Sequence, residues 1–310
     1  MSISQAKSTL QDVPPVALAA NGKVLSTATN RLGYLTPTDP SAGIETIRHL
    51  YGMQGYVWLK GLLPRSSVID FRGWVFSHLA DTGLVRPGLD PALGIAAGGA
   101  FDRQLTDRRI MSLVRSAAYE GFCAQPLLSR FMDEFLGGLS YLHKRKIMRF
   151  TQPGSPVATP AHYDLVYLRG GTSRIVTAWI PLGDISVDMG GLVYLEGSHA
   201  LGLKMEQEFS AKAAELTPEE RINAYNAHMT EGGWISKNLP DMANRFDTRW
   251  LIADFEAGDV MLHSPYMIHA STANDDPQDR IRLSTDIRYQ NVEDEIDARW
   301  TNHWSLGDML

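Results

Sequence analysis

The sequence has almost no cysteine, no cluster of positive charge and no long hydrophobic run, and each absence excludes a class of protein. Its 310 residues contain a single cysteine, Cys123, so an internal disulfide is excluded and a reducing compartment is expected. The formal net charge of −6 and the lack of a strongly basic block argue against nucleic acid or an anionic membrane as the main partner. Neither a membrane span nor a secretory signal is recognisable. We therefore expect a cytoplasmic protein.

Linkers, low-complexity tracts and internal repeats are also missing, which bears on the domain organisation. The length and the 44% of hydrophobic residues suit one large domain or at most two. We expect a loose N-terminal arm over residues 1–30 and a single domain over residues 31–310, with the oligomeric state open and a homodimer as one option. No Gly-x-Gly-x-x-Gly motif opens a helix after a strand, so a doubly wound dinucleotide fold is not expected.

The pattern of elements changes near residue 145. Before it, helices are predicted over residues 40–52 and 64–83, with one or two more within residues 105–139, and a strand over residues 55–63. Cys123 lies in a stretch typical of a core helix, so we expect an inert buried thiol there. After residue 145, short runs punctuated by Gly, Asp and Pro predict strands, with the order 144–152, 162–169, 174–185, 190–199, 250–264 and 280–290.

This succession of helices and then strands predicts an α+β fold. A β-sandwich or jelly roll with N-terminal helices buttressing one sheet satisfies the pattern. The helical part spans residues 40–140 and the jelly-roll core spans residues 145–290. A polar insertion over residues 200–250 interrupts the strands and contains a predicted helix over residues 217–228.

The segment that starts with His162 contains the first candidate site. His162 and Asp164 are two positions apart in a predicted strand, so their side chains should point to the same face. A buried carboxylate beside an imidazole needs a partner, and a divalent metal is one such partner. The pair alone is better explained as a hydrogen-bonded structural pair. A facial metal triad would need a second imidazole, for which His263 and His269 are the candidates.

Three blocks of the sequence together resemble the phytanoyl-CoA dioxygenase family of iron(II)- and 2-oxoglutarate-dependent oxygenases. They are "HYD" at residues 162–164, "TAWIPLGDISVDMGGLVYLEGSHALG" at residues 177–202 and "GDVMLHSPYMIHASTANDDPQDRIRLS" at residues 258–284. The resemblance covers roughly residues 145–290. It implies a double-stranded β-helix, that is, a cupin-like jelly roll, with Fe(2+) as the metal and 2-oxoglutarate and O2 as co-substrates.

Position by position, the resemblance implies that His162, Asp164 and His269 are the iron ligands. His269 is favoured over His263 because "HAS" and the spacing to Arg280 match the family pattern. Arg280 lies eleven residues after His269, where the family has the arginine that grips the far carboxylate of 2-oxoglutarate. No catalytic residue beyond the metal ligands is predicted.

Further residues of the co-substrate pocket follow from the same resemblance. Ser271 matches a hydroxyl that bonds this carboxylate, and Trp179 and Met148 match positions that line the pocket. Arg282 is the rival of Arg280, since even-numbered polar residues alternate with apolar ones from Arg280 to Arg288. Such a polar face lies either in water or, as the family's architecture implies, inside the barrel above an apolar face that packs beneath helices.

The resemblance implies an enzyme that couples decarboxylation of 2-oxoglutarate to oxidation of a C–H bond. Related halogenases replace the carboxylate ligand with a small residue, so the presence of Asp164 favours hydroxylation, with desaturation, epoxidation and rearrangement open. We expect a small, largely hydrophobic substrate from specialised or lipid-related metabolism, whereas a CoA thioester has no specific support. An apolar lid in the insertion is predicted from Met205, Tyr225, Met229, Trp234 and Trp250.

Two alternatives stay open at this point. The first is a cupin-type metalloenzyme that does not use 2-oxoglutarate and so has no need of an arginine for its carboxylate. The second is a non-catalytic jelly-roll binding protein in which the histidines are structural.

Overall fold

The computed structural model describes residues 17–306, apart from residues 214, 218–219, 222, 225–226 and 228–232. The helices are α1 (Ile44–Gln54), α2 (Arg65–Ser77), α3 (Arg103–Leu113), α4 (Ala117–Cys123), α5 (Pro126–Leu136), α6 (Leu165–Leu168), α7 (Ser198–Ala213) and α9 (Leu239–Arg245). The strands are β1 (Ala19–Ala20), β2 (Lys23–Val24), β3 (Leu32–Tyr34), β4 (Pro37–Thr38), β5 (Tyr56–Leu59), β6 (Ser140–Leu142), β7 (Ile147–Thr151), β8 (Val176–Pro181), β9 (Leu192–Leu195), β10 (Trp250–Ile252), β11 (Val260–His263), β12 (His269–Ser271) and β13 (Arg282–Asn291).

Two sheets carry most of these strands. The larger has the order β4-β5-β11-β8-β13-β6, with β7 also paired to β13, and the smaller has the order β12-β9-β10-β3. Neighbours in the larger sheet come from distant parts of the chain, so closing the barrel brings the first and last thirds of the sequence together. The sheets face each other across a buried cluster that includes Trp58 and Trp179 from the larger sheet and Leu192 and Tyr194 from the smaller.

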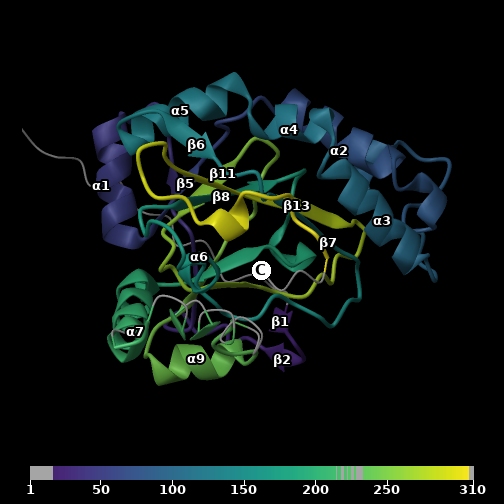
Figure 1. Cartoon of the computed structure of the whole chain (residues 1–310). Coiled ribbons are helices and arrows are strands. Elements are labelled where there is room, and N and C mark those ends of the chain that lie inside the picture. The colour runs from purple at the N-terminus through teal and green to yellow at the C-terminus, as the bar shows by residue number, and fades with distance from the viewer. Residues whose placement is uncertain are drawn as a thin grey trace, which may run out of the picture.

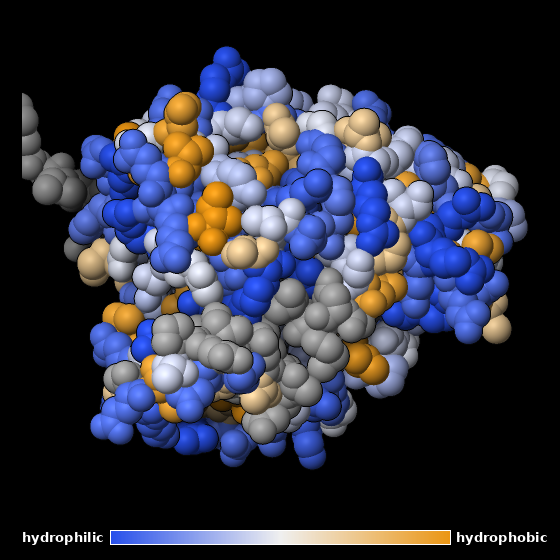
Figure 2. Space-filling view, viewed as in Figure 1, coloured by the Kyte–Doolittle hydropathy of each residue, from blue (hydrophilic) through white to orange (hydrophobic). Residues whose placement is uncertain are grey.

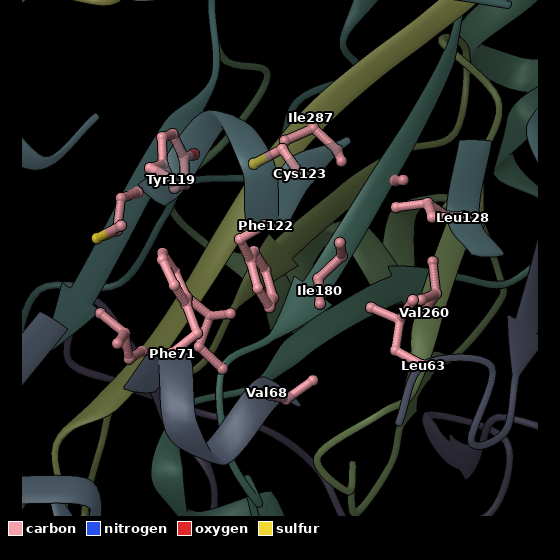
Figure 3. Packing of buried hydrophobic residues seen from close by; sticks show 14 of the residues in the cluster. Leu63, Val68, Phe71, Tyr119, Phe122, Cys123, Leu128, Ile180, Val260 and Ile287 are labelled. Carbon is pink, nitrogen blue, oxygen red and sulfur yellow. The ribbon is translucent and has the colours of Figure 1, made fainter. Parts of the chain in front are cut away.

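Helices cover the outer face of the larger sheet. Figure 1 shows α1 to α5 as one layer along β5, β11, β8 and β13, while α7 and α9 lie on the opposite side of the molecule. Figure 3 shows Phe122 from the helical layer in one packed cluster with the strand residues Ile180 and Ile287. Phe71 stacks on Phe122 with 4.1 Å between ring centroids, which extends the apolar contact along α2.

The helical part contains three helices within the range where one or two were predicted. α3 and α4 are separated because Ser116 caps α4 by accepting a hydrogen bond from the Tyr119 amide. Cys123 is buried at the end of α4, as expected of a core thiol, and burial raises the pKa of this thiol to about 12. A thiolate is therefore not formed near neutral pH.

The predicted N-terminal arm is only partly described. Residues 1–16 lie outside the described residues, but Leu18, Ala20 and Leu25 are buried in a cluster on the outer face of the smaller sheet. The Ala273 amide donates to the Ala19 carbonyl at 2.7 Å. This stretch is thus ordered by docking onto the barrel.

The face of the molecule shown in Figure 2 is mostly hydrophilic. Hydrophobic residues are scattered singly among hydrophilic ones over most of the face in Figure 2. Among the described residues, no helix is both long and apolar enough to cross a bilayer.

Candidate metal and 2-oxoglutarate site

The segment that carries His162 and Asp164 folds differently from the predicted strand over residues 162–169. His162 makes a single bridge, in which its amide donates to the His269 carbonyl at 3.0 Å and the His269 amide donates back at 2.9 Å. The chain then turns into α6, because the Leu165 amide bonds to the Pro265 carbonyl at 2.9 Å and not to a neighbouring strand. The strand prediction was wrong, and it is this turn at Asp164 that directs the carboxylate toward the imidazoles.

His162, Asp164 and His269 form a compact buried cluster. One ligand atom from each lies within 4.8 Å of the other two. Asp164 Oδ1 lies 3.8 Å from His162 Nε2 and 3.7 Å from His269 Nε2. Two imidazoles and one carboxylate on one side of a point match the donor set that non-haem iron prefers.

The other nitrogen of each imidazole is already occupied. His162 Nδ1 lies 2.8 Å from the Pro160 carbonyl, and His269 Nδ1 lies 2.9 Å from the Met267 carbonyl. Because a carbonyl only accepts, Nδ1 must carry the proton in both rings and Nε2 keeps its lone pair. Burial lowers the pKa of both histidines, which keeps the rings neutral.

The two carboxylate oxygens of Asp164 also have separate roles. Its Oδ2 accepts hydrogen bonds from Thr177 Oγ1, from His263 Nε2 at 3.3 Å and from Arg288 Nη2 at 3.3 Å, and this leaves Oδ1 facing the imidazoles. Burial alone would raise the pKa of this group, but Arg288 and the hydrogen bond from His263 outweigh it, so the pKa is well below its usual range.

His263 therefore lies behind the cluster, where it orients Asp164. Its Nδ1 lies 2.8 Å from the Tyr194 hydroxyl, so both ring nitrogens have partners. The structure brings His269, and not His263, to the face that Asp164 Oδ1 occupies.

The two candidate arginines differ sharply in their surroundings. Arg280 precedes β13, and its guanidinium is held by Asp276 with distances down to 2.6 Å. It lines neither of the cavities that contain triad residues. Arg282 is the first residue of β13, and it lines the small cavity that all three triad residues also line. The structure thus places Arg280 outside the triad cavity, with its side chain paired to Asp276.

Arg282 is buried and poorly paired. Its guanidinium lies over the Trp179 ring, 5.9 Å from the centroid. Within the described part of the chain, its Nε has no hydrogen-bond partner. Burial lowers its pKa to about 10, so it stays charged at neutral pH. A guanidinium in this state is stabilised strongly by a carboxylate ligand.

The remaining predicted pocket residues lie around this arginine. The Ser271 hydroxyl accepts from the Thr159 amide at 2.8 Å and lines the same cavity as Arg282. Trp179 forms another part of that cavity. Met148 lines a neighbouring cavity of about 550 Å³, which Arg282 and Ser271 also reach.

A second neighbouring cavity, of about 290 Å³, lies on the side of His162 and Asp164. Arg149, Arg288, Trp300 and Trp304 line it, and none of them was predicted as a site residue. The even-numbered alternation along β13 could have indicated Arg288, which shares its face with Arg282. Nothing in the sequence pointed to the two tryptophans.

The predicted apolar lid is supported only in part. Trp250 was assigned wrongly, because it is buried in β10 and its indole donates to the Leu239 carbonyl at 2.8 Å. Trp234 is 41% exposed and lines the 290 Å³ cavity, whereas Met205 lies in α7 beside another cavity. Tyr225 and Met229 lie outside the described residues.

Comparison with known proteins agrees with this geometry. The model of the family described as Phytanoyl-CoA dioxygenase (PhyH) matches residues 51–282, about three quarters of the chain. The chain belongs to this family. Two relatives are named 1-deoxypentalenic acid 11-beta-hydroxylase, from Streptomyces arenae with 27% identity and from Streptomyces exfoliatus with 25%. Each match covers 79% of this chain and 81% of the relative.

Solved structures with a similar fold include two from nogalamycin biosynthesis. The epimerase SnoN, in complex with Fe3+, alpha ketoglutarate and nogalamycin RO, has a TM-score of 0.54 and 19% identity, and the match covers 83% of this chain and 87% of that one. The carbocyclase SnoK has a TM-score of 0.53 and 18% identity, with 84% and 89% covered. These likenesses confirm the predicted α+β double-stranded β-helix.

The predicted enzyme class is confirmed as well. The protein is a non-haem iron, 2-oxoglutarate-dependent dioxygenase of the phytanoyl-CoA dioxygenase family, with iron and 2-oxoglutarate as its cofactor and co-substrate.

Proposed function

We propose that this dioxygenase hydroxylates, or otherwise oxidises, a C–H bond of a small and largely hydrophobic metabolite. In this proposal His162, Asp164 and His269 hold the iron. Arg282 and Ser271 hold the far carboxylate of 2-oxoglutarate, with Trp179 and Met148 nearby. Arg282 replaces Arg280 in this role because it lines the triad cavity and its Nε has no partner among the described residues.

One observation carries the proposal. A single small cavity is lined by the two imidazoles, by the carboxylate, by a hydroxyl and by the buried guanidinium of Arg282. Each of the three triad side chains turns one ligand atom toward the cavity, and its other polar atom is fixed by hydrogen bonds. A purely structural His–Asp cluster gives no reason for an unpaired arginine in the same cavity.

The site would hold iron and 2-oxoglutarate, which together would activate dioxygen for oxidation of a C–H bond. The chain itself orients the ligands and excludes water. Outer hydrogen bonds from Thr177, His263 and Arg288 fix the carboxylate, and such partners commonly decide how tightly a metal is held.

The substrate class rests on the cavity beside His162 and Asp164. Its volume of about 290 Å³ and its aromatic lining suit a small apolar molecule. The relatives named as hydroxylases support hydroxylation as the reaction. Asp164 supplies the carboxylate that a halogenase would lack. We further propose that residues 31–310 act as one catalytic domain in the cytoplasm, in line with the single cysteine.

The decisive test is succinate formation from 2-oxoglutarate by the full chain, measured with and without iron(II) and oxygen. We expect succinate that depends on both, at a low uncoupled rate without substrate. Asp164→Ala and His162→Ala should abolish it. Iron binding in the wild type without any succinate would favour a cupin-type enzyme that does not use 2-oxoglutarate, and no iron binding would favour a non-catalytic jelly-roll protein.

A spectroscopic arm separates binding from turnover. Iron(II) and 2-oxoglutarate added without oxygen should produce a weak visible charge-transfer band if the keto acid chelates the metal. Iron binding with no such band would contradict the assignment of 2-oxoglutarate.

A further inference from the structure

The 290 Å³ cavity combines aromatic walls, which suit an apolar substrate, with charged groups that a purely apolar substrate would not require. Tyr167, Trp234, Trp300 and Trp304 give it aromatic walls. Arg149 and Arg288 add two guanidinium groups beside the triad residues His162 and Asp164. Charged side chains are rarely placed in a small cavity unless a ligand or a partner stabilises them.

The charges around the triad do not balance. Three guanidiniums, those of Arg149, Arg282 and Arg288, line the small triad cavity, against two carboxylates, those of Asp164 and Asp286. Iron(II) and doubly charged 2-oxoglutarate cancel one another, so the loaded site still carries one excess positive charge. A neutral substrate would bury that charge without compensation, at a cost that an anionic substrate avoids.

Arg149 is the group best able to meet an anion. Its Nε donates to Asp286 Oδ2 at 3.1 Å, and this is its one hydrogen bond in the described part of the chain. Its side chain is 41% exposed, so the terminal nitrogens are accessible from the cavities. Arg149 lines both the triad cavity and the 290 Å³ cavity, whereas Arg288 is buried, with Nη2 directed at Asp164.

We infer that the substrate is a small apolar carboxylate, whose carboxylate binds the fork of Arg149 while its hydrocarbon body packs against Trp300 and Trp304. Arg288 lines the same cavity as a second positive charge and orients Asp164. This inference rests on the proposed function, since it assigns the substrate of the same site. A guanidinium meets a carboxylate with two parallel hydrogen bonds, and the body adds apolar burial.

Two of the four aromatic wall residues come from a part of the chain that the family model does not cover. The family model ends at residue 282, while Trp300 and Trp304 lie beyond it. Trp300 is buried and its indole donates to the Tyr167 carbonyl at 3.0 Å, and Arg115 holds the Trp304 carbonyl at 3.3 Å. The C-terminal segment is therefore fixed over the cavity at two points, and it gives this chain its own selectivity.

The test uses the full chain with iron(II) and excess 2-oxoglutarate, without oxygen, so that the co-substrate site is filled. Isothermal titration calorimetry compares 1-adamantanecarboxylate, 1-naphthoate and cyclohexylacetate with their primary amides. We expect at least one acid to bind at least tenfold more tightly than its amide. Arg149→Gln should remove this difference, and Arg149→Lys should keep part of it.

Two further variants make the comparison specific. Trp304→Ala should weaken the binding of an acid and of its amide by the same factor, because it removes the aromatic wall and not the charge. Arg103→Gln is the matched control, since Arg103 lines the 550 Å³ cavity and is paired with Asp107. It should leave the acid preference unchanged.

The inference is overturned if no acid in the panel binds more tightly than its amide, or if the preference survives Arg149→Gln. Uncoupled succinate formation separates this failure from a failure of the proposed function. Wild-type enzyme that makes succinate but shows no acid preference contradicts only the substrate class. Acid preference that depends on Arg149 without any succinate contradicts only the oxygenase chemistry.

Discussion

At the residue scale, the site depends on which atom of each ligand is already bonded. His162 and His269 each donate a hydrogen bond from Nδ1 to a backbone carbonyl, and Asp164 Oδ2 accepts from three donors. The free atoms then face one another within 4.8 Å. Outer partners, and not the triad residues themselves, set this geometry, so they should be the sensitive positions for metal affinity.

Thr177→Val tests this with a change of one atom type. Thr177 is buried and its hydroxyl donates to Asp164 Oδ2, so the isosteric valine should lower iron affinity by about 10- to 100-fold. The matched control is Thr285→Val, whose hydroxyl bonds the Ile147 carbonyl and the Tyr119 hydroxyl on the helical side. That variant should lose about 1–3 kcal/mol of unfolding free energy and keep its iron affinity. Equal iron affinities for the two variants, measured by titration, would contradict the role given to Thr177.

Arg282→Met and Arg280→Met separate the two candidate arginines. Loss of the buried Arg282 charge should weaken 2-oxoglutarate binding by at least about 100-fold, because removing one partner of a buried ion pair costs about 3–5 kcal/mol. Arg280 forms an ion pair with Asp276, so the Arg280→Met variant should bind 2-oxoglutarate as the wild type does. The dissociation constants from anaerobic calorimetry give the comparison, and the opposite order would return the role to Arg280.

At the scale of elements, alternation was the most reliable signal in the sequence. Ile281, Leu283 and Ile287 pack into the core beneath the helices, while Arg282 and Arg288 face the barrel interior, as the family's architecture implied. The helices predicted before residue 140 and most strands lie where hydrophobic periodicity placed them, whereas much of the helix predicted over residues 217–228 lies outside the described residues. Periodicity failed where a tertiary contact decides the backbone.

Three elements show where that limit lies. The run after His162 alternates like a strand, yet the bond from Leu165 to the Pro265 loop turns it into α6. α7 and α9 were not predicted, because the polar composition of the insertion gives little periodic signal. The resemblance to the family implied the triad, and the structure brings its three residues together, but the place of Arg282 beside them could not be predicted, since it depends on where Asp276 lies.

The C-terminal segment yields a prediction at this scale. Asp297 is buried, caps the 3-10 helix Ala298–Trp300 and accepts from the Gly170 amide at 3.0 Å. A Cβ added at Gly170 would lie 2.7 Å from Asp297 Oδ2, so this glycine permits the close approach. Asp297→Ala should remove the cap and about 1 kcal/mol of local stability, and amide exchange in the segment should become about fivefold faster.

Exchange measured by mass spectrometry at residues 298–306 tests this prediction. Asp90→Ala removes an equivalent cap on the 3-10 helix Pro91–Leu93 and serves as the control. It should not change exchange in the C-terminal segment. Unchanged exchange in both variants would mean that Asp297 does not hold the segment in place.

At the scale of the whole molecule, three buried clusters join the helices, the two sheets and the N-terminal stretch. Titratable groups caught in this packing make stability depend on pH. His143 is fully buried between β6 and β7, and its Nε2 lies 2.8 Å from Gln290 Oε1. Burial lowers its pKa to about 4 from the ordinary value of 6.5.

The sign of the dependence follows from proton uptake. Between pH 6.5 and about 4 the unfolded chain binds a proton at this histidine and the folded chain does not, so stability falls as pH falls through this range. The loss amounts to about 1.4 kcal/mol per pH unit, or about 3 kcal/mol in total. Urea unfolding from pH 7 to pH 4 should show this slope in the wild type and a smaller one in His143→Gln. His49→Gln, at an exposed position, should keep the wild-type slope.

Strand β13 places hydrophobic anchors for the helices and guanidiniums for the reaction on opposite sides of ten consecutive residues. Removing or adding one residue inside it would exchange the two sets, so that arginines would face the hydrophobic core and leucine would face the barrel interior. The strand can therefore change length only in steps of two without ruining folding and chemistry together.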